Sequence, residues 1–328
     1  SAFECENCGE AFFNSYLSQS VCDDLLCFPC ASEREEESPS HIGDYHSRTR
    51  RAETHAIHSP WSLSHGRRLF GVELEVEART GTEHRALNDY AGEILTAVRD
   101  WADTPRRLWC EHDGSLSNGF EIITAPMGLD LQRELWARVL SLGTMKHFKS
   151  HDTSTCGLHV HVSRQGLTQM QIAKAIVFLN DDRTEGLVRC VARRYGGGYC
   201  QKRDNVKLSR HISHDINRYT MLNTLPSSTV EFRLFRGSLR LETVLGCIEF
   251  ANAVLDWCRD VSAQDLTVPS FLAWIHDANN RADTANLRAL LNRRAPAMSG
   301  AIARVLSLYQ RPAAPAIAPV SFLTTPEE

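Results

Sequence analysis

Three short segments of this sequence alternate between apolar residues and charged or histidine residues, and this pattern constrains the fold most. The segments are 71–77, 156–162 and 229–235. Successive side chains of a β-strand point to opposite faces of a sheet, so each segment is predicted to be a strand with one apolar and one polar face. Buried parallel strands are usually apolar on both faces. We therefore expect an α+β fold whose antiparallel sheet has helices on one face and an active site on the other.

The polar faces of these strands, and of a fourth predicted strand near residue 121, carry groups that bind cations and phosphates. They are Glu73, Glu75, Glu121, His159, His161, Glu231 and Arg233. Carboxylates gathered on one face repel one another unless a cation lies among them. Oxygen ligands with one or two imidazoles suit Mg²⁺ or Mn²⁺, and an arginine beside the metal suits a phosphate. Each segment alone also fits a solvated surface, but their joint occurrence favours a site.

Apolar residues at helical spacing predict helices elsewhere in the chain. They cover 88–101, 129–142, 168–180 and 241–257, with two or three more between 268 and 308. The basic segment 183–209 contains Gly196-Gly197-Gly198 and is predicted to be a loop. No Lys-Ser or Lys-Thr follows these glycines, so they do not form a Walker-type phosphate loop.

Five of the 11 cysteines fall within the first 30 residues. Two Cys-x₂-Cys pairs, Cys5 with Cys8 and Cys27 with Cys30, fit a structural Cys₄ zinc site, and Cys22 is an alternative ligand. A module of this size has too little core to fold without a cross-link. We therefore expect a zinc module that is structural or recognises a protein partner.

The overall composition narrows the class of protein. The formal net charge of −4 does not indicate nucleic-acid binding, and no run of 18 apolar residues indicates a membrane span. The odd number of cysteines and the absence of a secretory signal favour the cytoplasm. The predicted divisions are a zinc module (1–31), a linker (32–64), a catalytic domain (65–262), a helical extension (263–310) and a tail rich in Pro and Ala (311–328).

Several short motifs follow one another along residues 67–260. They are Gly-Val-Glu-Leu-Glu from 71, Asp-Gly-Ser from 113 with Gly-Phe-Glu-Ile from 119, Cys-Gly-Leu-His-Val-His from 156, Arg-Tyr-Thr-Met-Leu-Asn from 218 and Thr-Val-Glu-Phe-Arg from 229. In this order they resemble the amidoligase family. Its members are carboxylate–amine ligases, often encoded by phages or mobile elements, and related in fold to glutamine synthetase and glutamate–cysteine ligase.

The resemblance implies an enzyme that uses ATP and Mg²⁺, or Mn²⁺, to join a carboxylate to an amine through an acyl phosphate. The substrate would be an amino acid, a peptide or a protein. The metal ligands that the resemblance implies are Glu73, Glu75, Glu121, His159 and Glu231.

The resemblance also implies roles for residues beside the metals. His161 would contact the substrate, and Arg233 would meet the transferred phosphoryl group. Arg218, Asn223 and Arg236 would complete the ATP site with Arg233.

Two other functions fit the same residues. One is a metal-dependent hydrolase that uses His159 and His161 around a water molecule, although no His-Glu-x-x-His pattern supports it. The other is a non-catalytic module that the zinc site recruits to a partner.

Overall fold

The computed structural model describes residues 40–44, 68–83, 86–99, 108–203, 217–280 and 282–294, together with 304 and 307. Within residues 1–39 it describes only the backbone of four short strands, which pair as two antiparallel ribbons: β1 (Ala2–Glu4) with β2 (Ala11–Phe13), and β3 (Leu17–Gln19) with β4 (Leu25–Cys27). The side chains of all five cysteines in this segment lie outside the described residues. The zinc module, and equally the tail 311–328, stay predictions.

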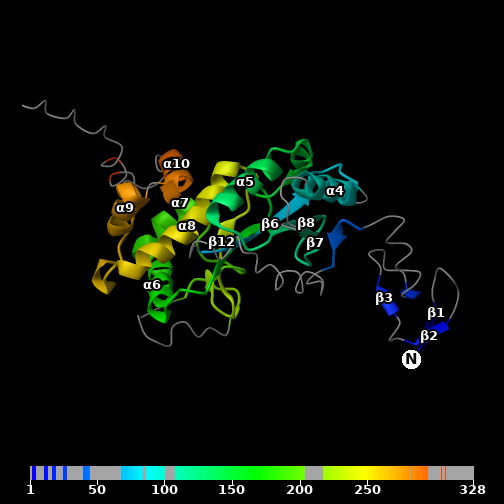
Figure 1. Cartoon of the computed structure of the whole chain (residues 1–328), viewed down its shortest axis with the longest axis horizontal. Coiled ribbons are helices and arrows are strands. Elements are labelled where there is room, and N and C mark those ends of the chain that lie inside the picture. The colour runs from blue at the N-terminus through cyan, green and yellow to red at the C-terminus, as the bar shows by residue number, and fades with distance from the viewer. Residues whose placement is uncertain are drawn as a thin grey trace, which may run out of the picture.

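The described part of the chain contains an eight-stranded sheet in the order β11-β12-β10-β6-β8-β7-β5, with β9 also paired to β6 (Figure 1). The strands are β5 (Ile42–Gly43), β6 (Phe70–Ala78), β7 (Leu108–Glu111), β8 (Gly119–Thr124), β9 (Phe148–Lys149), β10 (Gly157–Ser163), β11 (Leu222–Asn223) and β12 (Thr229–Arg236). Every pairing is antiparallel except that of β5 with β7. The three alternating segments are therefore strands, as their pattern predicts.

Strand β5 departs from the sequence prediction. Residues 32–64 were expected to form a linker, but Ile42 and Gly43 pair in parallel with Cys110 and Glu111, and Ile42 is buried in the core. These two residues therefore belong to the sheet, and the extent of the linker stays a prediction. A two-residue strand is too short to show an alternating pattern, so only the tertiary structure reveals it.

Seven α-helices are described beside the sheet. They are α4 (Ala86–Arg99), α5 (Leu129–Leu140), α6 (Gln169–Asn180), α7 (Glu185–Ala192), α8 (Leu241–Asp260), α9 (Val268–His276) and α10 (Ala285–Arg294). Helix α8 is buried along most of its length and packs against β10, α5, α6 and α10. Its Phe250 meets the ring of Phe235 in β12 edge-on, with centroids 6.1 Å apart. This helix therefore covers the apolar face of the sheet.

Helix α7 corrects a second expectation, because it lies inside the segment predicted as a loop. Leu187, Val188 and Val191 are buried at helical spacing, but the surrounding arginines obscured this short apolar stripe in the sequence. The glycine run is outside helices and strands, and Gly196 and Gly197 have positive φ angles that suit glycine. None of the described helices combines the length and apolar character needed to cross a membrane.

Candidate active site

The register of the strands places the polar positions in a row across one face of the sheet. Residues that are directly paired on neighbouring strands direct their side chains to the same face. The pairs are Asn223 with Glu231, Glu231 with His161, His159 with Glu73, Glu75 with Glu121, and Glu121 with Glu111. The structure thus brings together all five carboxylate and imidazole groups expected to hold metal, with His161 beside them.

The first group of possible ligands is Glu73, His159 and Glu231, which offer atoms within 4.8 Å of one another. The Nδ1 atom of His159 lies 3.2 Å from Oε2 of Glu73 and 3.8 Å from Oε1 of Glu231. The Nε2 atom of His161 lies 3.2 Å from the other oxygen of Glu73. Two carboxylates and an imidazole form a donor set that suits a divalent cation.

The second group is Glu75, Asp113 and Glu121, whose oxygens also lie within 4.8 Å of one another. Asp113 comes from the loop between β7 and β8, where its Oδ1 accepts a hydrogen bond of 2.6 Å from the amide of Ser115. Sequence reasoning gave Asp113 no role, although its Asp-Gly-Ser motif was the available signal. An all-oxygen group suits Mg²⁺ or Mn²⁺.

Gly157 lies where the two groups meet, and a side chain at this position would crowd both of them. Its amide donates a short hydrogen bond to Glu75. A Cβ atom here would lie 3.1 Å from Nε2 of His159 and 3.4 Å from Oε2 of Glu75. The missing side chain therefore lets an imidazole and a carboxylate approach the same stretch of backbone.

The charges of the site shift the pKa values of its members in opposite directions. Burial, together with the charges of Glu73, Glu75 and Asp113, raises the pKa of Glu121 to about 10. Burial also raises the pKa of Glu75. Burial would raise that of Glu73 too, but His161 and His159 hold its pKa well below the usual range. Burial opposes the charge on His161, yet Glu73 and Glu231 raise its pKa to about 9. The histidines therefore offset the negative charge of the first group more than that of the second, which of these two histidines only His159 approaches, at 4.0 Å from Glu75.

A β-bulge in β12 positions Arg233. Where β10 has the single residue His159 between Leu158 and Val160, strand β12 has two residues, Arg233 and Leu234, opposite it. The guanidinium of Arg194 satisfies the carbonyls of the bulge at 2.6 and 3.0 Å. Arg233 pairs with Glu231, whose other oxygen accepts a hydrogen bond of 2.7 Å from Asn223. The bulge therefore brings a guanidinium to the first group of ligands.

The contacts of Arg236 and Arg218 in this structure are with groups outside the two ligand groups. Arg236 donates to the carbonyl of Thr153 at 3.4 Å and lines a separate cavity. Arg218 lies over the ring of Tyr219, with Cζ 5.2 Å from its centroid. Their roles toward ATP stay predictions.

Comparison with known proteins does not assign the chain to a family. No family model and no curated protein matches the chain. Among solved structures, it is similar to a chain in the crystal structure of the complex between prokaryotic ubiquitin-like protein Pup and its ligase PafA, with 12% identity and a TM-score of 0.35. The match covers 74% of this chain and 62% of that chain, so this chain spans less than two thirds of its neighbour. The proposal below rests on the geometry of the site.

Cation binding to the second group is expected to release a proton. Because the pKa of Glu121 is about 10 in the metal-free protein, this carboxyl is protonated at neutral pH, and a cation must displace the proton. The affinity for Mn²⁺ should therefore rise by up to about tenfold per pH unit near neutrality. Titration calorimetry in buffers of different ionisation enthalpy measures the proton released. Glu121→Gln should bind more weakly and with almost no pH dependence, whereas an unchanged slope would contradict this assignment.

Proposed function

We propose that this chain is a metal- and ATP-dependent carboxylate–amine ligase. The observation that carries the proposal is the pair of adjoining ligand groups, Glu73–His159–Glu231 and Glu75–Asp113–Glu121, on one face of one sheet. Buried carboxylates so close together need a counter-charge, and two divalent cations would supply it. The all-oxygen character of the second group favours Mg²⁺ or Mn²⁺ over a structural zinc ion.

A phosphoryl group fits beside these ligands. The Nε atom of Arg233 is buried and has no hydrogen-bond partner among the described residues, while its Nη1 already pairs with Glu231. A guanidinium with a spare buried donor next to a cation site is suited to a phosphate oxygen. This combination favours ligase chemistry with ATP over simple hydrolysis, which needs no such arginine.

In the proposed reaction, an oxygen of the substrate carboxylate attacks the γ-phosphorus of ATP, and the bond from that phosphorus to the bridging oxygen breaks. ADP leaves and an acyl phosphate forms. The amine nitrogen then attacks the acyl carbon, loses a proton, and displaces phosphate to give the amide. The metal ions would offset the negative charge that accumulates between the phosphates and the carboxylate.

The residues of the chain would have different roles in this reaction. The two ligand groups would hold the cations, and Arg233 would stabilise charge on the transferred phosphoryl group. His161, with a raised pKa of about 9, is positively charged at neutral pH and is 3.2 Å from Glu73. It would orient the carboxylate of the substrate from the rim of the first group.

The test is product formation from a pool of amino acids and peptides labelled with ¹⁸O in their carboxylates. With ATP and Mg²⁺, we expect ADP release, a new amide mass, and one ¹⁸O atom in the phosphate that is released. Glu231→Gln is the control without a complete first group. Metal-dependent cleavage products that form equally well without ATP would instead support the hydrolase and overturn the proposal.

A further inference from the structure

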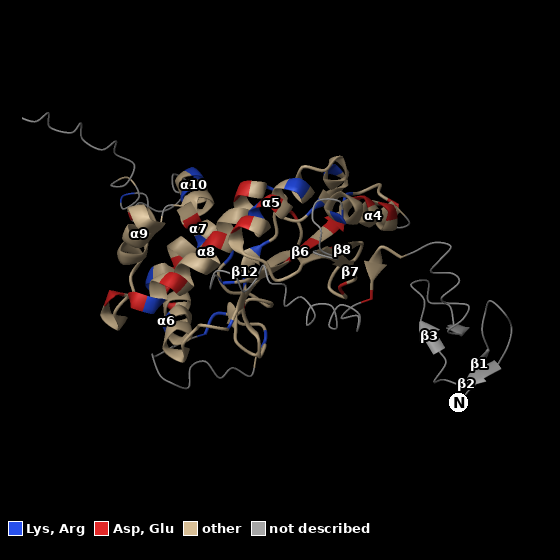
Figure 2. Ribbon diagram, viewed as in Figure 1, with Lys and Arg blue, Asp and Glu red and all other residues tan. Residues whose placement is uncertain are grey.

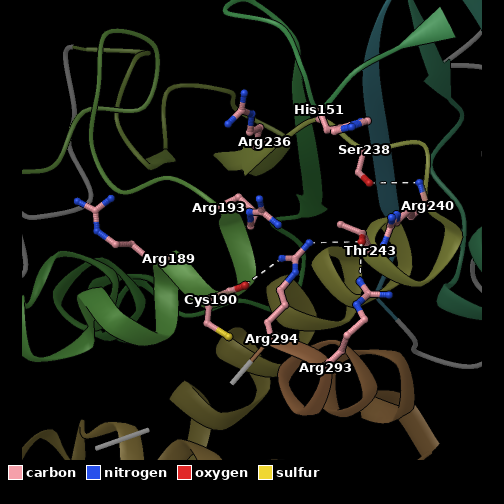
Figure 3. A pocket seen from close by; sticks show the side chains of 11 residues that line it. His151, Arg189, Cys190, Arg193, Arg236, Ser238, Arg240, Thr243, Arg293 and Arg294 are labelled. Atoms are coloured by element: carbon pink, nitrogen blue, oxygen red, sulfur yellow. Dashed lines mark hydrogen bonds between the residues drawn. The ribbon is translucent and has the colours of Figure 1, made fainter. Parts of the chain in front are cut away.

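A second candidate site lies where the ends of α7 and α10 meet the connection from β12 to α8. The described residues there enclose a cavity of about 650 Å³ (Figure 3). No residue that lines it is acidic. Six of the lining residues are arginines: Arg189, Arg193, Arg236, Arg240, Arg293 and Arg294. On the helices, by contrast, acidic and basic residues are mixed (Figure 2). The cavity is therefore a local concentration of positive charge in a chain of net charge −4.

Most of this charge is not neutralised by the protein. Arg189 pairs with Glu185, and Arg293 pairs with Glu242. Within the described part of the chain, the other four arginines form no ion pair with a carboxylate. Arg294 donates only to neutral groups, including the carbonyls of Cys190 at 2.9 Å and Val191 at 2.7 Å. Four guanidinium groups thus line one cavity, and none of them has a carboxylate partner among the described residues.

The backbone around the cavity adds to this arrangement. Arg193 ends α7 in the left-handed conformation, with φ of 64°, where glycine or asparagine is the usual residue. No other described non-glycine residue has a positive φ. Its side chain lies at the centre of the close-up in Figure 3. The N-terminus of α8, a 20-residue helix, also reaches the cavity through Arg240 and Thr243, and its dipole favours an anion there.

Arg294 is held as a cation in a partly buried place beside other arginines. Burial, and the nearby charges of Arg193 and Arg293, lower its pKa from the ordinary value. Guanidinium groups held together at such a cost are typical of sites that bind an anion with several charges.

We propose that this cavity binds a small ligand that carries two or more linked phosphate groups. Four unpaired guanidinium groups match the charge of a di- or triphosphate and bind its oxygens in bidentate fashion. A volume of about 650 Å³ is in the range of small-molecule sites. The cavity shares no residue with either ligand group of the candidate active site, and Arg236 is the one lining residue that the resemblance assigns to ATP. Binding through Arg193, Arg240 and Arg294 is therefore expected without a divalent cation, and it does not rest on the proposed ligase activity.

Titration calorimetry of the full chain in EDTA tests the proposal. The probes are inorganic pyrophosphate, inorganic triphosphate and ATP, with citrate as the carboxylate comparison. We expect at least one phosphate probe to bind and citrate to bind at least about tenfold more weakly. Tighter binding of ATP than of triphosphate would show that the ligand is a nucleotide, and equal binding would show that the phosphates alone are recognised.

Two variants locate the site. Arg240→Ala removes one unpaired guanidinium, and Arg193→Gly removes another while suiting the left-handed backbone. Each should weaken binding by about ten- to a hundredfold, in line with the loss of charge-assisted hydrogen bonds. Arg259→Ala, at the far end of α8 and paired with Asp256 at 2.8 Å, is the matched control and should bind normally. Melting curves establish that each variant is folded.

The proposal would be overturned by no binding of any phosphate probe, by unchanged binding in both folded variants, or by citrate binding as tight as that of triphosphate. A DNA duplex that binds more tightly than every small probe, and is lost in both variants, would also overturn it by showing a nucleic-acid surface.

Discussion

Replacing Arg233 with alanine is expected to slow ATP turnover by about 10²–10³-fold while leaving the metal ligands in place. Arg233 has one nitrogen on Glu231 and a buried Nε without a partner among the described residues, so a phosphate beside Glu231 is within its reach. Charge that develops on the phosphoryl group in a shielded site depends strongly on such a donor. The measurement is ADP release at saturating Mg²⁺, with Mn²⁺ affinity measured in parallel.

The effect of this substitution on stability follows from the structure rather than the sequence. The sequence predicts an arginine that is hydrated or paired and whose loss costs little stability. The structure pairs it with Glu231, whose side chain is only 4% exposed, so its loss should cost more. Removing one partner of a buried pair is expected to destabilise the metal-free protein by about 3 kcal/mol. A divalent cation should restore much of this loss, because it takes over as counter-charge.

Arg233→Lys is the matched control, since it keeps the charge without the planar fork. It should preserve stability better than alanine does and still turn over ATP slowly. If Arg233→Ala has near-normal turnover, the arginine does not contact the phosphate. If Mn²⁺ fails to raise the melting temperature of Arg233→Ala, the cation does not bind beside Glu231.

Replacing Glu73 with glutamine is expected to have the second large effect. Glu73 lies within 3.2 Å of both His159 and His161, and it belongs to the first ligand group. Mn²⁺ affinity at that group should fall by at least about 10²-fold, since even residues behind the ligands change affinity by 10–100-fold. In the metal-free protein the pKa of His161 should fall from about 9 toward its ordinary value, because its nearest counter-charge is gone.

The raised pKa of His161 also predicts how the stability of the protein changes with pH. A histidine whose pKa is raised by folding stabilises the protein below its unfolded pKa, and the contribution is lost as the pH rises through about 9. Between pH 6.5 and pH 9, Glu73→Gln should therefore lose less stability than the parent protein does. Imidazole NMR measures the pKa directly. Glu77→Gln is the control on the same strand, where Glu77 contacts Thr155 at 3.0 Å instead of a histidine. An unshifted His161 pKa in Glu73→Gln would show that another group holds the proton.

The sequence was sufficient to predict which side chains share a face. The alternation around Glu73, His159 and Glu231 is a local property, because the period of a strand is two residues wherever it pairs. The order of the strands is not local, and it decides that Glu75 pairs with Glu121 while Glu73 pairs with His159. The division of the carboxylates into two groups therefore emerged only from the fold.

The features that escaped sequence reasoning all depend on long-range contacts. Asp113 reaches Glu75 from a loop, and the bulge that presents Arg233 exists only where β12 meets β10. The arginine cavity joins residues about 100 positions apart, such as Arg189 and Arg294. Within the segment 183–209, which the sequence predicts to be a loop, α7 supplies Arg189 and Cys190 to the cavity, and Arg193, which ends this helix, also lines it.

Anomalous diffraction from crystals soaked with Mn²⁺ and a non-hydrolysable ATP analogue tests the central claim most directly. We expect two manganese peaks on the polar face of the sheet, one bound by Glu73, His159 and Glu231 and the other by Glu75, Asp113 and Glu121. The γ-phosphate of the analogue should contact Arg233. Crystals in which the ATP analogue is fully occupied but no manganese lies at either group would contradict this expectation. An analogue bound away from this face of the sheet would contradict it as well.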